Sequence, residues 1–92
     1  MIGDDRRRQI MARVTPLLQA IDPEVLLLEV LLDSTRQQLA FVMQKGEWPL
    51  VIGMNWLDYV SHRDEELQAR LQEGIAKRLE VVQQRQAREE EE

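Results

Sequence analysis

The chain has 92 residues and a mass of 10.8 kDa, which is the size of one small domain. Hydrophobic residues make up 43% and charged residues 32%, a composition typical of folded globular proteins rather than disordered or fibrous ones. The chain contains no cysteine and one histidine, His62, which excludes disulfides, thiolate nucleophiles and two-histidine metal sites within one chain. We therefore expect no metal, no cofactor and no enzymatic activity.

The net charge of −5 arises in the C-terminal half of the chain. Residues 1–46 carry six basic and six acidic side chains, whereas residues 47–92 carry six basic and eleven acidic ones. The last four residues are all glutamate, so we expect a single α+β domain over 1–88 and a solvated acidic tail at 89–92. A domain without a basic surplus argues against a nucleic-acid surface.

The uncharged stretches are short. The longest, residues 48–57, has ten residues, whereas a membrane-spanning helix needs about 20. The N-terminus has acidic and then basic residues, without the apolar stretch of a secretory signal. We expect a cytoplasmic protein that does not enter a membrane.

Residues 4–21 are predicted to form the first helix. Asp22-Pro23 ends it, because a residue before proline avoids helical backbone angles. Pro16 lacks an N–H group and crowds the preceding turn, so we expect a kink or a restart at residues 15–16. Apolar residues recur along one stripe of this helix, at Ile10, Val14, Leu17, Leu18 and Ile21.

Three apolar runs follow, at residues 25–33, 38–44 and 48–54. The third contains Pro49 and Gly53, which disfavour helix, and a turn with Gly46 joins it to the second, as in a β-hairpin. The first run fits a strand or a leucine-rich helix. As a strand it completes a three-stranded antiparallel meander and predicts an α-β-β-β-α domain. As a helix it would make the chain an all-α bundle.

The first strand is expected to be apolar on both faces, whereas a sheet with one wet face alternates apolar and polar residues. Strict alternation places Val25, Leu27, Glu29 and Leu31 on one face. It places Leu26, Leu28, Val30 and Leu32 on the other. Either each helix covers a different face of the sheet, or both cover one face and a second chain covers the other. Under the second interpretation we expect Leu28 to lie inside and Leu27 to face the partner.

Two helices are predicted after the strands. Asn55 can cap a short helical turn, and Ser61 with Asp64 can start a long helix that runs to about residue 87. Gly74 lies within the long helix and indicates a close approach of helix to sheet. Its apolar stripe consists of Leu67, Leu71, Ile75, Leu79 and Val82.

The order helix–three strands–helix over residues 4–87 is similar to that of double-stranded RNA-binding domains. In that family, basic residues at the start of the second helix contact phosphates across a groove. Here residues 62–66 read His-Arg-Asp-Glu-Glu, which is the wrong charge for phosphate contact. The resemblance therefore concerns topology, and no RNA-binding site is carried over.

Four residues are predicted to contact a protein partner or a second copy: Leu27, Leu31, Trp48 and Trp56. The leucines belong to the outward strand face, and tryptophan is enriched at interfaces, although packing at the edge of the core is the alternative. We expect a small interaction protein, such as an adaptor, a chaperone-like subunit or an assembly factor, that acts as a homodimer or with a protein partner. The alternative is a nucleic-acid-associated regulator that uses Arg6, Arg7 and Arg8.

Two ionisable residues could carry chemistry, but each has a simpler structural role. His62 at a helix start is more typical of a surface residue than of a catalytic or pH-sensing group. Glu29 lies within an apolar strand, where burial could raise the pKa of its carboxyl group. We expect Glu29 either to lie at an edge or to pair with an arginine such as Arg13.

Overall fold

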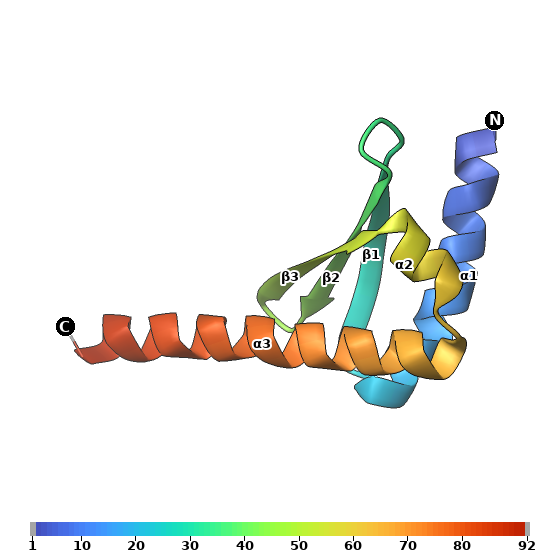
Figure 1. The fold of residues 1–92 in the computed structure, drawn as a ribbon. Coiled ribbons are helices and arrows are strands. Elements are labelled where there is room, and N and C mark those ends of the chain that lie inside the picture. The colour runs from blue at the N-terminus through green and yellow to red at the C-terminus, as the bar shows by residue number, and fades with distance from the viewer. Residues whose placement is uncertain (1, 92) are drawn as a thin grey trace.

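The computed structural model describes the backbone of residues 2–91 and the side chains of residues 5–85. The element order confirms the predicted α-β-β-β-α domain and is incompatible with the all-α alternative (Figure 1). The short helix and the long helix predicted after the strands are both present. The elements are α1 (Ile2–Ile21), β1 (Val25–Asp33), β2 (Gln38–Lys45), β3 (Trp48–Asn55), α2 (Trp56–Ser61) and α3 (Asp64–Glu91).

The three strands form one antiparallel sheet in the order β1-β2-β3. The β2–β3 hairpin has a two-residue loop. Its first residue, Gly46, has a φ of 59°, whereas the φ of the second, Glu47, is not positive. Positive φ at the first loop residue alone is the pattern of a type II′ turn, whose twist suits a hairpin. The predicted glycine turn is therefore confirmed.

Helix α1 continues through Pro16, so of the two alternatives predicted at residues 15–16, a kink or a restart, the restart is wrong. Pro16 is exposed, while Val14 and Leu18 on either side of it are buried in the core. Packing of this stripe holds the helix together where the local preference of proline would break it, because tertiary contacts outweigh propensity.

Both long helices cover the same face of the sheet. The buried residues of β2 and β3 all lie on one side of the pleat, and they pack against the apolar stripes of α1 and α3 and against Tyr59 of α2. The fold is therefore a two-layer α+β domain, and the three-layer alternative is excluded. The sheet contributes Val25, Val30, Leu39, Phe41, Met43, Leu50, Ile52 and Met54 to the core, and the long helices contribute Ile10, Val14, Leu18, Leu67, Leu71 and Ile75.

A β-bulge in β1 changes the predicted facing of its side chains. The register with β2 shifts between Leu27 and Glu29, so that Leu28 is an extra residue in the strand. Before the bulge, Val25 and Leu27 face the helices; after it, Val30 does. The expectation that Leu28 lies inside and Leu27 outside is therefore wrong. Strict alternation failed because the extra residue changes the face on which each later side chain lies.

Gly74 lets α3 approach β3 closely, as predicted. A Cβ atom added at Gly74 would lie 3.0 Å from Cδ1 of Ile52, which is closer than side-chain carbons normally pack. The C-terminal half of α3 then extends past the sheet (Figure 1). The backbone of α3 continues to Glu91, beyond the predicted end near residue 87. The side chains of the predicted acidic tail, 89–92, lie outside the described residues.

Arg13 of α1 binds the junction between α2 and α3. Its guanidinium donates hydrogen bonds to the Asp64 carboxylate at 2.7 Å and to the backbone carbonyls of Tyr59 and His62 at 3.2 and 2.7 Å. It also lies over the Tyr59 ring, 4.9 Å from its centroid. These carbonyls lie at the end of α2, where helical hydrogen bonding stops, so Arg13 caps that helix and fixes it against α1.

Candidate functional site

The face of the sheet opposite the helices is apolar and uncovered. We call six of its residues the outer sheet face: Leu26, Leu28, Leu31, Ala40, Val42 and Val51. The three leucines are 61%, 51% and 53% exposed, and Val51 is 47% exposed. Isolated exposed aliphatic side chains are normal on a protein surface, but a contiguous group of them marks an interaction site or an aggregation hazard.

The strand register groups Leu31, Ala40, Val42 and Val51 together, whereas Gln44 lies opposite Leu26 on the same face. Leu31 is opposite Ala40, and Ala40 is opposite Gly53, so one row falls from a large side chain to almost none. In the next row, Val42 lies between Glu29 and Val51. The side chains of the outer sheet face are therefore large along β1 and smallest at Ala40 and Gly53.

The charged residue next to this face is neutralised. The Arg7 guanidinium donates a hydrogen bond to Oε1 of Glu29 at 2.9 Å, and both side chains are about two-fifths exposed, at 43% and 41%. Glu29 is therefore paired with an arginine, as expected, but with Arg7 rather than Arg13. Arg7 belongs to α1, which packs beside β1, and the pair lies at the rim of the outer sheet face.

The structure separates the four residues predicted to contact a partner. Leu31 lies on the outer sheet face, whereas Leu27 is half-buried against the core. Alternation along β3 puts Trp48 on the helix-covered side, at the exposed start of the strand. Trp56 stacks on Tyr59 with 5.6 Å between ring centroids, which makes it a packing residue at the edge of the core.

Sequence reasoning missed Leu26, Leu28 and Val51 as members of the outer sheet face. The bulge in β1 decides the facing of the first two. Every residue from 25 to 28 is apolar, so the sequence contains no polar alternation that could locate the bulge. Val51 could have been found, because it alternates with the buried residues of β3.

The predicted arginine cluster does not form one basic patch. Arg6 lies over the Trp56 ring, 5.0 Å from its centroid, and Arg7 pairs with Glu29. Two of the three charges are therefore directed to different internal partners. The first turn of α3 is acidic, with Asp64, Glu65 and Glu66, in agreement with the sequence-based argument against phosphate contact.

His62 serves as a helix cap. Its backbone N–H donates to the Asp58 carbonyl at 3.1 Å, and its ring Nδ1 contacts the same oxygen. Within residues 5–85, the part of the chain with described side chains, His, Asp and Glu do not gather into a group that could hold a metal ion. The described helices contain no stretch long and apolar enough to cross a membrane.

The geometry thus offers the outer sheet face as a candidate interaction surface. Comparison of the chain with models of known protein families, with curated proteins and with solved structures gave no match.

Proposed function

We propose that this chain is a protein-interaction module that forms a homodimer by packing its outer sheet face against that of a second copy. The observation that carries the proposal is the exposure of Leu26, Leu28 and Leu31 on β1 and of Val51 on β3, on the face of the sheet that no helix covers. An antiparallel sheet with one layer of helices commonly has a polar second face, so an apolar second face favours burial, and in β-sandwiches a second sheet covers it.

The shape of the outer sheet face supports a second copy as the occupant. A two-fold axis could lie between the two sheets, parallel to β2. It would place the leucine side chains of β1 in each copy over β3 of the other copy. Leu31 of one copy would then pack over Ala40 and Gly53 of the other copy, two small residues that are neighbours across β2 and β3. Such a contact is satisfied twice by symmetry, as in an isologous dimer.

The size of the face fits a modest dimer. Strands about 4.8 Å apart and about 3.3 Å per residue give a face of roughly 14 by 26 Å. Two such faces cover roughly 700 Å² in total, which is below the usual size of specific interfaces, so we expect a weak dimer. Covering each half-exposed leucine or valine contributes about 1 kcal/mol. After the entropic cost of association, we expect a dissociation constant in the micromolar range.

The edges of the sheet are less suited than its face to pairing between copies. The bulge at Leu28 interrupts the edge of β1, and Pro49 removes one backbone donor from the edge of β3, so both edges are less regular than the face. The Arg7–Glu29 pair at the rim satisfies both charges within one chain. The apolar face therefore remains the self-complementary surface.

A matched pair of leucine variants tests the proposal. Leu31→Glu puts a charge on the outer sheet face, whereas Leu57→Glu puts the same charge on α2, where Leu57 is 63% exposed. We expect sedimentation equilibrium to show a dimer for the unmodified chain and Leu57→Glu, and a folded monomer for Leu31→Glu. The proposal would be contradicted if the unmodified chain stayed monomeric at high micromolar concentration. It would also be contradicted if both variants dimerised equally.

A further inference from the structure

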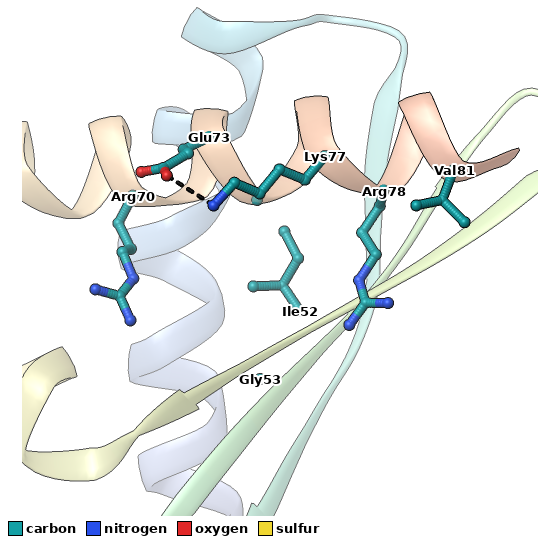
Figure 2. Close-up of a pocket in the computed structure, with 8 residues that line it drawn as sticks. Ile52, Gly53, Arg70, Glu73, Lys77, Arg78 and Val81 are labelled. Atoms are coloured by element: carbon teal, nitrogen blue, oxygen red, sulfur yellow. Dashed lines mark ion pairs between the residues drawn. The ribbon is translucent and has the colours of Figure 1, made fainter. Parts of the chain in front are cut away.

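A basic groove runs between β3 and α3 and borders the outer sheet face at Val51. One part is a pocket of about 300 Å³ lined by Ile52 and Gly53 and by Arg70, Lys77 and Arg78 of α3. Figure 2 shows the side chains of Arg70 and Arg78 extending from α3 on either side of Ile52. We call this pocket, with its continuation along the strand, the β3–α3 groove.

The continuation of the groove follows the free edge of the sheet. A neighbouring pocket of about 340 Å³ shares Gly53 and Arg78 with the first and is also lined by Val51, Val82 and Arg85. Since β3 is the last strand in the sheet, its second edge has no neighbouring strand. The groove therefore combines apolar side chains, strand backbone and positive charge.

The hairpin geometry shows which backbone groups lie at this edge. In a two-residue hairpin the closing pair, here Lys45 and Trp48, exchanges backbone hydrogen bonds, and every second pair along the ladder does the same. The Trp56 N–H donates to the Gln37 carbonyl at 2.8 Å, which continues this set of pairs. Even-numbered residues of β3 therefore bond to β2, and odd-numbered ones direct their N–H and C=O groups outward.

Three of the outward-directed residues lie along the groove: Pro49, Val51 and Gly53. Pro49 has no backbone N–H. Because this position is directed outward, the β2–β3 ladder loses no hydrogen bond. Val51 and Gly53 each present a backbone N–H donor and a C=O acceptor at this edge. Among the described residues, no backbone hydrogen bond from a turn, loop or cap reaches these groups. An extended peptide laid along this edge would satisfy them.

The charge beside this edge is mainly positive. Arg70, Lys77, Arg78 and Arg85 line the two pockets, and the single acidic lining residue, Glu73, pairs with Lys77 at 2.9 Å. This is a local positive surplus on a chain with a net charge of −5. A second copy paired edge to edge here would bring two basic groups together, so repulsion disfavours it.

We propose that the β3–α3 groove binds an extended acidic segment of a partner protein, which adds to the sheet as a strand beside β3. Backbone hydrogen bonds to Val51 and Gly53 supply the affinity common to any extended peptide, and Arg78 and Arg85 select carboxylate side chains. The groove and the outer sheet face share Val51, whose side chain belongs to the face and whose backbone lies at the free edge of β3.

The probe is a short peptide of alternating valine and glutamate with blocked ends, and the control peptide alternates valine and lysine. NMR titration at low salt should show saturable binding of the acidic peptide only, weakened by added salt. Amide hydrogen exchange at Val51 and Gly53 should slow about tenfold or more at saturation, because a new strand protects outward-facing donors. Binding without this protection would mean electrostatic contact alone and would overturn the strand-addition proposal.

Charge reversal separates the groove from the rest of the surface. Arg78→Glu with Arg85→Glu should raise the dissociation constant of the acidic peptide about tenfold or more, whereas Arg36→Glu, remote from the groove, should leave it unchanged. Arg36, Arg78 and Arg85 are all exposed, so the variants should keep the unmodified far-UV circular dichroism. Unchanged affinity in the double variant would contradict the proposal. If the double variant instead dissociated a dimer, the groove would hold a second copy.

Discussion

Phe41 and Val42 are neighbours in β2, yet they lie in different environments. Phe41 is fully buried beneath α1 and α3, whereas Val42 lies in the middle of a face that no helix covers. Both faces of the sheet are apolar, so composition alone does not distinguish the core from the interface. The difference comes from where the helices pack. One face stabilises the monomer, and the other is left with apolar surface to bury.

The largest contrast between the two faces is expected from truncating these neighbours. Phe41→Ala removes a fully buried ring and should lower the free energy of unfolding by about 3–5 kcal/mol. Val42→Ala should cost the monomer less than about 1 kcal/mol, because Val42 is only partly buried and no helix packs on it. Urea denaturation at low micromolar concentration measures both. Equal losses would mean that the outer sheet face is covered within the chain.

A second contrast concerns the two leucines on either side of the bulge in β1. Leu27→Asp puts a charge against the core and should lower the free energy of unfolding by about 2–4 kcal/mol. Leu28→Asp lies on the outer sheet face and should leave the monomer folded while weakening self-association. Thermal unfolding monitored by circular dichroism, beside sedimentation, distinguishes the two. The reverse order of stability would indicate an unbulged strand.

Gly74 tests how closely α3 packs on the covered face of the sheet. Alanine at this position gains about 1 kcal/mol in helix propensity but overlaps Cδ1 of Ile52, and overpacking costs about 1–3 kcal/mol. We expect Gly74→Ala to destabilise the chain by about 1 kcal/mol. In an Ile52→Val background, which lacks Cδ1, the same change should be stabilising. A double-mutant cycle by urea denaturation shows whether the sign reverses, and an unchanged sign would disprove the close contact.

The smallest expected effect is a pH dependence at the end of α1. The Lys45 ammonium lies 2.6 Å from the Asp22 carboxylate, and this hydrogen bond lowers the pKa of Asp22 and raises the pKa of Lys45. With its pKa lowered on folding, Asp22 stabilises the fold at neutral pH. That contribution is lost as the pH falls below about 4, through the pKa of the folded state. Asp22→Asn should therefore flatten part of the acid-induced loss of stability.

At high pH, the stabilisation by the same ion pair depends on pH with the opposite sign. Because the pKa of Lys45 is raised on folding, its contribution is fully present below the usual lysine pKa and is lost as the pH rises above about 10. The pair is partly exposed, with side-chain exposures of 30% for Lys45 and 22% for Asp22, so solvent screens the effect. Thermal denaturation across pH, compared between the unmodified chain and Asp22→Asn, measures both limbs. Parallel curves for the two proteins would contradict the assignment.

Much of the fold could be predicted because local signals agreed with it. Gly46 and Pro49 indicated a hairpin, the stripes of α1 and α3 identified the helical half of the core, and Gly74 indicated the close helix–sheet contact. The restart at Pro16 was wrong because burial of Val14 and Leu18 outweighs the local preference of proline. Local rules succeed where packing reinforces them and fail where packing overrides them.

The outer sheet face could be predicted in kind but not residue by residue. Two apolar faces were evident in the sequence, whereas their membership depended on a one-residue bulge within four successive apolar residues. The β3–α3 groove gave no sequence signal, because Arg70, Lys77, Arg78 and Arg85 are interspersed with other residues and face β3 only after α3 packs on the sheet.

Methyl NMR with a paramagnetic cosolute tests most directly that a second copy covers the outer sheet face. At a concentration where the dimer predominates, methyl groups of Leu26, Leu31 and Val51 should be protected from broadening, while those of Leu57 on α2 should broaden strongly. On dilution to the monomer, the outer-face methyl groups should become as accessible as those of Leu57. Equal accessibility of both groups at every concentration would show that the outer sheet face is not an interface between copies.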